Sequence, residues 1–178
     1  MSLSMVMKKI PEHFDDLIKT ALPPLQWIEP SAIPQPQRFL LVHTGDMTGK
    51  LERFYSEDIH LDTIEAEVED DSIYRLVLLK TESEQIVEFG VIRIYLDVFD
   101  EETKAVVLGC RQPLGGILNE REMEYSSQLQ GFVSVESNEP FNQYLGLECS
   151  QRLYGRKNRL ITSDGRTIAD VVEILPPS

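Results

Sequence analysis

Residues 59–99 hold three long segments with the composition of β-strands, separated only by short turns. IHLDTIEAEVED (residues 59–70) alternates polar and apolar residues over most of its length. SIYRLVLLKT (72–81) and IVEFGVIRIYLDVF (86–99) are rich in β-branched and aromatic side chains. Such patterns are typical of strands, and the four residues ESEQ (82–85) suffice for a hairpin. The sequence therefore predicts an antiparallel sheet, because a hairpin reverses the chain.

The rest of the chain adds strands and helices to this sheet. Strand patterns occupy residues 121–137, 148–163 and 167–175, with a tight turn at Asp164-Gly165 between the last two. Helices are predicted at residues 11–22, 100–109 and 113–118; residues 37–57 predict a helix, a turn at 44–46 and more helix or an extended connection, and residues 138–146 a loop or helical turn. We therefore predict the α+β class, with an antiparallel sheet and helices packed on one face.

Five prolines interrupt the regular pattern in PPLQWIEPSAIPQPQ (residues 23–37). Proline lacks the backbone N–H that helices and sheets use, so this segment is expected to be an ordered loop or an extended arm. We expect Trp27 and Ile28 to fix it to the core. A length of 178 residues suits one domain, residues 1–178. Residues 1–10 are expected to be partly an expression leftover or disordered.

The charge balance excludes some classes of partner. The formal net charge is −13, so the phosphates of nucleic acids and of anionic membranes would be repelled by the average surface. No apolar run approaches the length of a transmembrane helix. A small anionic ligand is still compatible with this balance, because the charge inside a pocket can oppose the overall charge. We expect no nucleic-acid or membrane partner, and a monomer or weak homo-oligomer.

Cysteine and histidine usage points away from metal chemistry. Cys110 and Cys149 fit two free thiols in a reducing compartment, and the cytoplasm is the default location. The histidines His13, His43 and His60 are scattered, and none stands at metal-ligand spacing from a cysteine pair. We therefore expect neither a metal nor a cofactor.

Arg75 lies among apolar neighbours in a predicted strand. Strand alternation places it on one face with Ile73 and Val77, and places Tyr74 and Leu76 on the other. If Arg75 points inward, a carboxylate or a ligand must neutralise it, because an isolated buried charge is costly. The alternative is an arginine on the solvent face. The residue pattern alone leaves both orientations open.

Glu173 interrupts a β-branched run in ADVVEILPP (residues 169–177). Asp170 lies three residues earlier, so alternation places the two acids on opposite faces of the strand. If one faces solvent, the other faces the covered side of the sheet. Burial would favour the protonated form of that carboxyl group, which suits proton donation or hydrogen bonding. The alternative is that both acids lie on a partly exposed strand.

Two further stretches are candidates for anion binding. In QPLGGIL (residues 112–118) two glycines permit a close backbone approach, and backbone N–H groups at a helix start bind carboxylates. The alternative is a plain helix-initiating turn. In QRLYGRKNR (151–159), alternation places Arg152 and Arg156 on one face. Most of these basic residues are expected to be solvated, while one or two can close over an anion.

Five motifs, in this order, carry a resemblance to a known family: GDMTGKLERF, YRLVLL, QPLGGIL, LYGRKNRL and VVEILP. From about Arg38 to its C-terminus, the chain resembles the chorismate pyruvate-lyases, including their small uncharacterised bacterial and archaeal subgroup. The resemblance implies helical flaps over a buried ligand cavity. It also implies a lyase that removes pyruvate from chorismate, an anionic substrate, to give 4-hydroxybenzoate for quinone biosynthesis.

The resemblance also implies roles for individual residues. Arg75 corresponds to the arginine that grips the aromatic carboxylate, and Leu114 to the residue whose backbone N–H helps to hold it. Met47 corresponds to a pocket residue, and Glu173 to an acid near the ring hydroxyl, so Arg75 and Glu173 are the expected catalytic residues. The residue pattern, rather than the resemblance, adds Gly115 and Arg156 to the expected substrate-binding set, with Arg156 or Lys157 as the group for the second carboxylate. The alternative function is a non-catalytic, sensor-like domain of the same fold that binds a small aromatic carboxylate.

Overall fold

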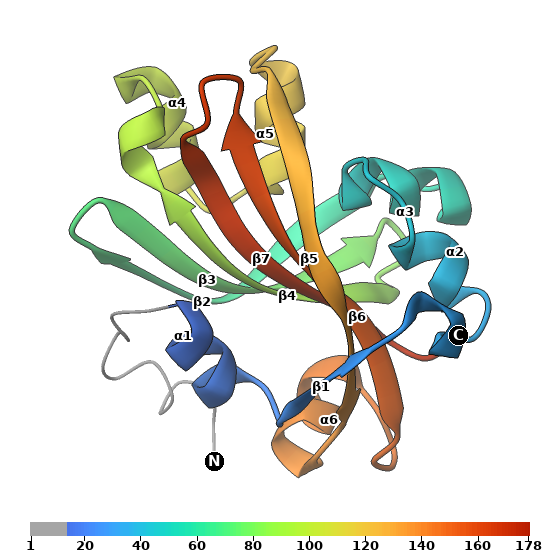
Figure 1. The fold of residues 1–178 in the computed structure, drawn as a ribbon. Coiled ribbons are helices and arrows are strands. Elements are labelled where there is room, and N and C mark those ends of the chain that lie inside the picture. Colours follow the sequence, from blue (N-terminus) through green and yellow to red (C-terminus); the bar gives the residue numbers. More distant parts are fainter. Residues whose placement is uncertain (1–13) are drawn as a thin grey trace.

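One antiparallel sheet runs through residues 14–178, the part of the chain that this computed structural model describes. Its strands are β1 (Leu25–Ile28), β2 (Ile59–Glu69), β3 (Ser72–Thr81), β4 (Ile86–Tyr95), β5 (Tyr125–Glu136), β6 (Arg152–Thr162) and β7 (Thr167–Leu175). In space they follow the order β1-β5-β6-β7-β4-β3-β2 (Figure 1). Strand β7 therefore joins two groups of three strands.

Helices connect and cover these strands. They are α1 (Phe14–Ala21), α2 (Gln37–Leu41), α3 (Met47–Tyr55), α4 (Glu101–Leu108), α5 (Leu114–Glu120) and α6 (Glu139–Leu145), with short 3-10 turns at Pro30–Ala32 and Leu96–Val98. Asp46 and Asp100 cap the starts of α3 and α4 by accepting hydrogen bonds from the backbone N–H groups of Gly49 and Thr103. No helix within residues 14–178 is long and apolar enough to cross a membrane.

The predicted α+β class with an antiparallel sheet is confirmed. The predicted hairpins connect β3 to β4 and β6 to β7, and the helices predicted at residues 100–109 and 113–118 correspond to α4 and α5. Residues 1–10, and the start of the helix predicted at 11–22, lie outside the described residues. The periodicity of the sequence was sufficient to predict these elements, because each strand is long and the hairpin connections contain turn-forming residues.

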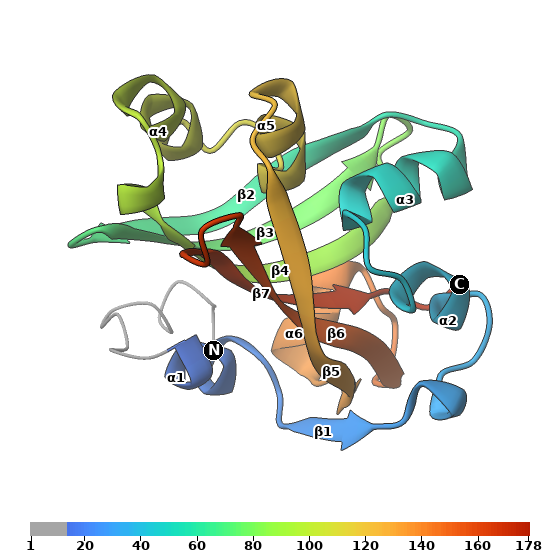
Figure 2. The same ribbon diagram turned by 45° about the horizontal axis from the view of Figure 1, so that its top comes forward.

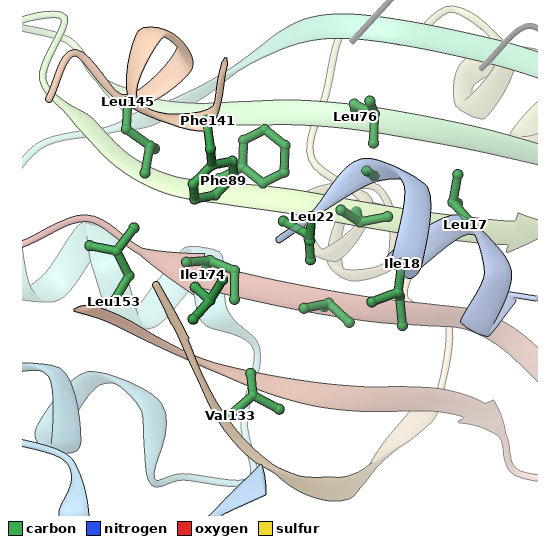
Figure 3. Packing of buried hydrophobic residues seen from close by; sticks show 14 of the residues in the cluster. Leu17, Ile18, Leu22, Leu76, Phe89, Val133, Phe141, Leu145, Leu153 and Ile174 are labelled. Carbon is green, nitrogen blue, oxygen red and sulfur yellow. The ribbon is translucent and has the colours of Figure 1, made fainter. Parts of the chain in front are cut away.

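Helices lie on both faces of the sheet rather than on the one face that was predicted. Helices α1 and α6 pack on one face, and α3, α4 and α5 lie over the other (Figure 2). The α1 side is a single apolar cluster in which Phe89 meets Phe141 edge to face, with ring centroids 4.8 Å apart (Figure 3). Strand β3 is buried on both faces, since Tyr74 and Leu76 enter this cluster while Arg75 and Val77 face the other helices.

The proline-rich segment is an extended arm, as predicted, but its tryptophan is not buried. Strand β1 attaches the arm by pairing with β5 at the edge of the sheet. Trp27 is 62% exposed, so the expectation that it fixes the arm to the core was wrong. Its ring covers Gly131, where an added Cβ would lie 2.6 Å from the indole. Ile28, by contrast, packs against buried residues, and backbone pairing supplies the remaining attachment.

Candidate ligand-binding site

A cavity lies between the sheet and the helices of its α3–α5 face. It encloses about 690 Å³ free of protein atoms, part of it open to solvent, and the centre of a water molecule can move through about 80 Å³ of it. All six residues predicted for the site line it: Met47, Arg75, Leu114, Gly115, Arg156 and Glu173. Their predicted roles are not tested by this placement.

Apolar packing stops on both sides of the cavity. Helices α4 and α5 form one buried cluster with the ends of β3, β4 and β7, and helices α2 and α3 form another with the opposite ends of the strands. Between the two clusters, the cavity walls combine apolar side chains such as Leu61, Leu79 and Leu160 with charged groups. An apolar wall with a few polar groups is the usual character of a ligand site.

Two rows of residues form the floor of the cavity. In the first row, Arg156 of β6 lies opposite Glu173 of β7, which lies opposite Gly90 of β4, which lies opposite Val77 of β3. Side chains in such a row point to the same face, because they are paired across the strands. A Cβ at Gly90 would come within 2.9 Å of Val77 Cγ2, so this glycine keeps the floor low beside Glu173.

The second row lies two residues further along each strand. It consists of Asn158, Val171, Ile92 and Arg75, again through direct pairing. Arg75 is thus two strands and two residues away from Glu173, a separation of about 12 Å between Cα atoms at the usual strand spacing and rise. Both side chains line the same cavity. A guanidinium and a carboxyl group therefore face the space between them from opposite sides.

Arg75 is a buried cation without a carboxylate partner among the described residues. It is 1% exposed and donates hydrogen bonds to the carbonyl oxygens of Val107 and Gln112, the second over 3.3 Å. Its Nε has no hydrogen-bond partner. Burial lowers the pKa of the guanidinium below its usual value. The partial negative charge of carbonyls at the end of α4 stabilises this cation, but it does not neutralise it.

Arg156 is equally buried but is fully partnered. Its Nε lies 2.5 Å from Glu173 Oε2, and its other nitrogens donate to the carbonyl oxygens of His43 and Gly45 over 3.0 and 3.3 Å. Burial, and next the positive charge of Arg156, lower the pKa of the His43 imidazole to about 4. His43 is therefore neutral at physiological pH. Arg156 was predicted to bind an anion, and such an anion must compete with Glu173 for the guanidinium.

Glu88 is a site residue that the sequence analysis missed. It is 4% exposed, lines the cavity, and its Oε2 has no hydrogen-bond partner. Burial, and next the negative charge of Glu173, raise its pKa well above the usual value. The available signal was the same as for Glu173, a single acid within an apolar strand. Only the pairing of β4 with β7 shows that the two acids share a face.

Asp46 connects the two helices over the cavity. Its carboxylate accepts from Gly49 N over 3.2 Å, which holds the start of α3. A Cβ at Gly115 would lie 2.7 Å from Asp46 Oδ1, so the first turn of α5 rests against the same carboxylate. Met47 and Leu114 are the first residues of the two helices and line the cavity beside Asp46. These helices have the positions of the predicted flaps.

Other predicted charges lie outside the site. Asp170 is on the face opposite Glu173, as alternation predicts, and neither acid faces solvent. Asp170 is buried and pairs with Arg159 at 2.7 Å. Arg152 is exposed and pairs with Glu136 at 2.7 Å, so the stretch 151–159 contributes only part of its charge to the cavity.

No protein-family model and no curated protein matches this sequence. Solved structures match its fold, which is the chorismate lyase-like fold found in GntR-family effector domains. YydK of Bacillus subtilis, described as a possible transcriptional regulator, matches with a TM-score of 0.54 at 13% identity, over 67% of this chain and 59% of its own. PhnF of Mycobacterium smegmatis matches with a TM-score of 0.55 at 8% identity, over 76% and 65%.

A ligand-binding domain has the same fold. It belongs to a Bordetella bronchiseptica protein assigned to the GntR family of transcriptional regulators, and it matches with a TM-score of 0.50 at 10% identity, over 68% of this chain and 85% of its own. The chain thus spans less than two thirds of the length of YydK and of PhnF. At these identities the likenesses show a shared fold.

The prediction of an enzyme is corrected by these comparisons. The fold led us to expect a chorismate pyruvate-lyase, but the structures that share it include a possible regulator and the ligand-binding domain of a regulator, and no lyase is among the three. Glu173, the expected catalytic acid, is held in an ion pair by Arg156, and its predicted role is not tested.

Proposed function

We propose that this chain is a non-catalytic domain that binds a small cyclic carboxylate in the cavity between the sheet and helices α3 and α5. The observation that carries the proposal is Arg75, a 1% exposed guanidinium with no carboxylate partner among residues 14–178. A buried cation of this kind is costly until an anion neutralises it. The ligand carboxylate supplies that charge.

Hydrogen bonding supports a carboxylate in particular. A guanidinium offers five N–H donors in a planar fork, which suits two carboxylate oxygens at once. Two protein carbonyls take one donor each at Arg75, and Nε is unpartnered. The remaining donors point to a second, charge-assisted set of bonds. Lysine would not fix the orientation of the ligand in this way.

The walls support a cyclic, apolar body for the ligand. Val77, Ile92 and Val171 line the cavity close to Arg75 in sequence or in pairing, and Leu114 follows two residues after Gln112, whose carbonyl accepts from Arg75. These side chains remove apolar surface from water, which favours a ring over a chain of hydroxyl groups. An apolar cavity with one charged anchor also suits a sensor-like domain, which binds its ligand without converting it.

Calorimetric titration with benzoate and 4-hydroxybenzoate tests the proposal. Arg75→Met keeps the length and apolar stem of the side chain but removes the charge, so we expect affinity to fall about 100-fold. Arg152→Met is the matched control, because Arg152 is an exposed arginine on β6, and it should bind as the wild type does.

Two results would contradict the proposal. One is binding of both carboxylates by Arg75→Met with wild-type affinity. The other is conversion of chorismate to 4-hydroxybenzoate by the purified protein, followed by absorbance. Thermal unfolding of Arg75→Met distinguishes lost binding from lost folding, since removing an unneutralised buried charge should not lower the melting temperature.

A further inference from the structure

The end of the cavity away from Arg75 carries more acids than bases. Glu88 and Glu173 contribute carboxyl groups there and Arg156 contributes one guanidinium, while Asp46 lies over the cavity where the starts of α3 and α5 meet. The charges of Glu173, Arg156 and Asp46 all act on the carboxyl group of Glu88. Since Arg75 is alone at the other end, the cavity is polarised, with a positive end and an acidic end.

The single cation at the acidic end is already used. Arg156 pairs with Glu173 at 2.5 Å and donates its remaining hydrogen bonds to backbone carbonyls. Asp46 accepts from Gly49 N at the start of α3. Glu88 is left with an unpartnered, fully buried Oε2 in the cavity wall. A buried polar atom without a partner destabilises the fold unless a ligand satisfies it.

From this polarity, and resting on the proposed function, we infer that the ligand is an amino carboxylate, with its carboxylate at Arg75 and its ammonium group between Glu88 and Glu173. An ammonium group carries three donors and no acceptor, which suits an end lined by carboxyl oxygens. A second carboxylate at the same place would be repelled by Glu173 and would raise the pKa of Glu88 further.

The strand register gives the two binding groups a suitable separation. Glu88 lies opposite Leu79 of β3, four residues along the strand from Arg75. The Cα atoms of Arg75 and Glu88 are therefore about 14 Å apart at the usual strand rise and spacing. Both side chains line the cavity and take up part of this distance, so the remaining span suits one six-membered ring with a substituent at each end.

Binding of an ammonium group should release a proton. Burial, and next the negative charge of Glu173, raise the pKa of Glu88 and so favour its protonated form. The groups that face it are Glu173 from β7, Arg156 from β6 and Asp46 at the start of α3, while His43 is neutral. A ligand cation beside Glu88 favours its carboxylate form, so the proton passes from Glu88 to the buffer. A neutral ligand group leaves the proton in place.

The probes are benzoate, 4-(aminomethyl)benzoate, the nearly isosteric 4-(hydroxymethyl)benzoate and terephthalate, titrated by calorimetry at pH 7 in phosphate and in Tris. We expect the aminomethyl compound to bind at least about 10-fold more tightly than the hydroxymethyl compound, and terephthalate to bind most weakly. The observed heat of the aminomethyl compound alone should differ between the buffers, by the amount that corresponds to about one proton released.

Glu88→Gln removes the ionisable group at nearly constant volume. In this variant the preference for the aminomethyl over the hydroxymethyl compound should disappear, together with the buffer dependence. Glu136→Gln is the matched control, because Glu136 is an exposed glutamate that pairs with Arg152, and it should behave as the wild type does. If Glu88→Gln does not fold, Glu88→Leu provides the same comparison.

The outcomes separate this inference from the proposed function. If none of the four carboxylates binds, both the proposed function and the inference fail. If benzoate binds but the hydroxymethyl compound equals or exceeds the aminomethyl compound, or no proton is released, only the inference fails. The buffer comparison on the wild type depends on no variant, so it decides the question by itself.

Discussion

The two faces of the sheet are built differently. The α1 face is one continuous apolar cluster, in which Phe89, Phe141 and Leu17 are almost completely buried (Figure 3). The other face is divided into two apolar clusters by a cavity that contains buried charges. Apolar packing stabilises the fold without a ligand, whereas a buried charge destabilises it unless a partner of opposite charge is present. Stability is therefore concentrated on one face, and binding on the other.

The largest effect should come from the apolar face. Phe89→Ala removes a ring that packs edge to face against Phe141, and we expect a loss of about 4 kcal/mol in the free energy of unfolding. Urea unfolding at pH 7 measures it. Phe54→Ala is the control, because Phe54 is 40% exposed on α3 and should cost much less. Equal losses in both variants would contradict the assignment of stability to the α1 face.

The next effect tests the paired charge on the cavity face. Arg156→Met leaves Glu173 buried without a cation, and we expect about 3 kcal/mol of destabilisation. Adding Glu173→Leu in the same chain should recover most of that loss, because both charges are then absent. Urea unfolding of the two single variants and of the double variant measures the coupling. A double variant less stable than Arg156→Met would show that the pair itself is not the cause.

The smallest effect should be an increase in the free energy of unfolding. Glu88→Leu removes an acid whose Oε2 has no partner, and we expect the empty protein to become more stable by about 1–2 kcal/mol at pH 7. The pKa of Glu88 is raised in the folded state, so the folded state binds more protons than the unfolded one above the unfolded pKa of about 4.3. Stability should therefore fall as pH rises from there toward the folded pKa.

Unfolding curves between pH 4 and pH 8 measure this dependence. The difference in stability between Glu88→Leu and the wild type should grow with pH over that interval. Glu136→Leu, at an exposed glutamate, is the control and should show no such growth. A difference that shrinks with rising pH would mean that Glu88 is stabilised as a carboxylate in the folded protein.

Local patterns were sufficient for most of the fold but not for the site. The strands and helices were predictable because period-2 and period-3.6 patterns are local properties of the chain. The orientation of Arg75 was not predictable, because β3 is buried on both faces and its alternation shows no contrast between core and solvent. The same reason explains Asp170, which lies on the predicted face but is buried and pairs with the partly exposed Arg159.

Residues that act across strands were the least predictable. Glu88 and Glu173 are far apart in sequence and share a face only through the pairing of β4 with β7. The exposure of Trp27 follows likewise from the pairing of β1 with the edge strand β5, since backbone hydrogen bonds hold the arm without a buried indole. The family resemblance supplied Arg75 and Glu173 as a pair, but it also implied a catalytic activity that the comparisons contradict.

The central position of β7 has a consequence for how the protein is made on the ribosome. Strands β2, β3 and β4 form one half of the sheet, strands β1, β5 and β6 form the other, and within the described residues β7 alone joins the halves. Arg75 belongs to the first half and Arg156 to the second. During synthesis both halves emerge before residues 167–175, so a nascent chain that stalls before this strand has no binding site.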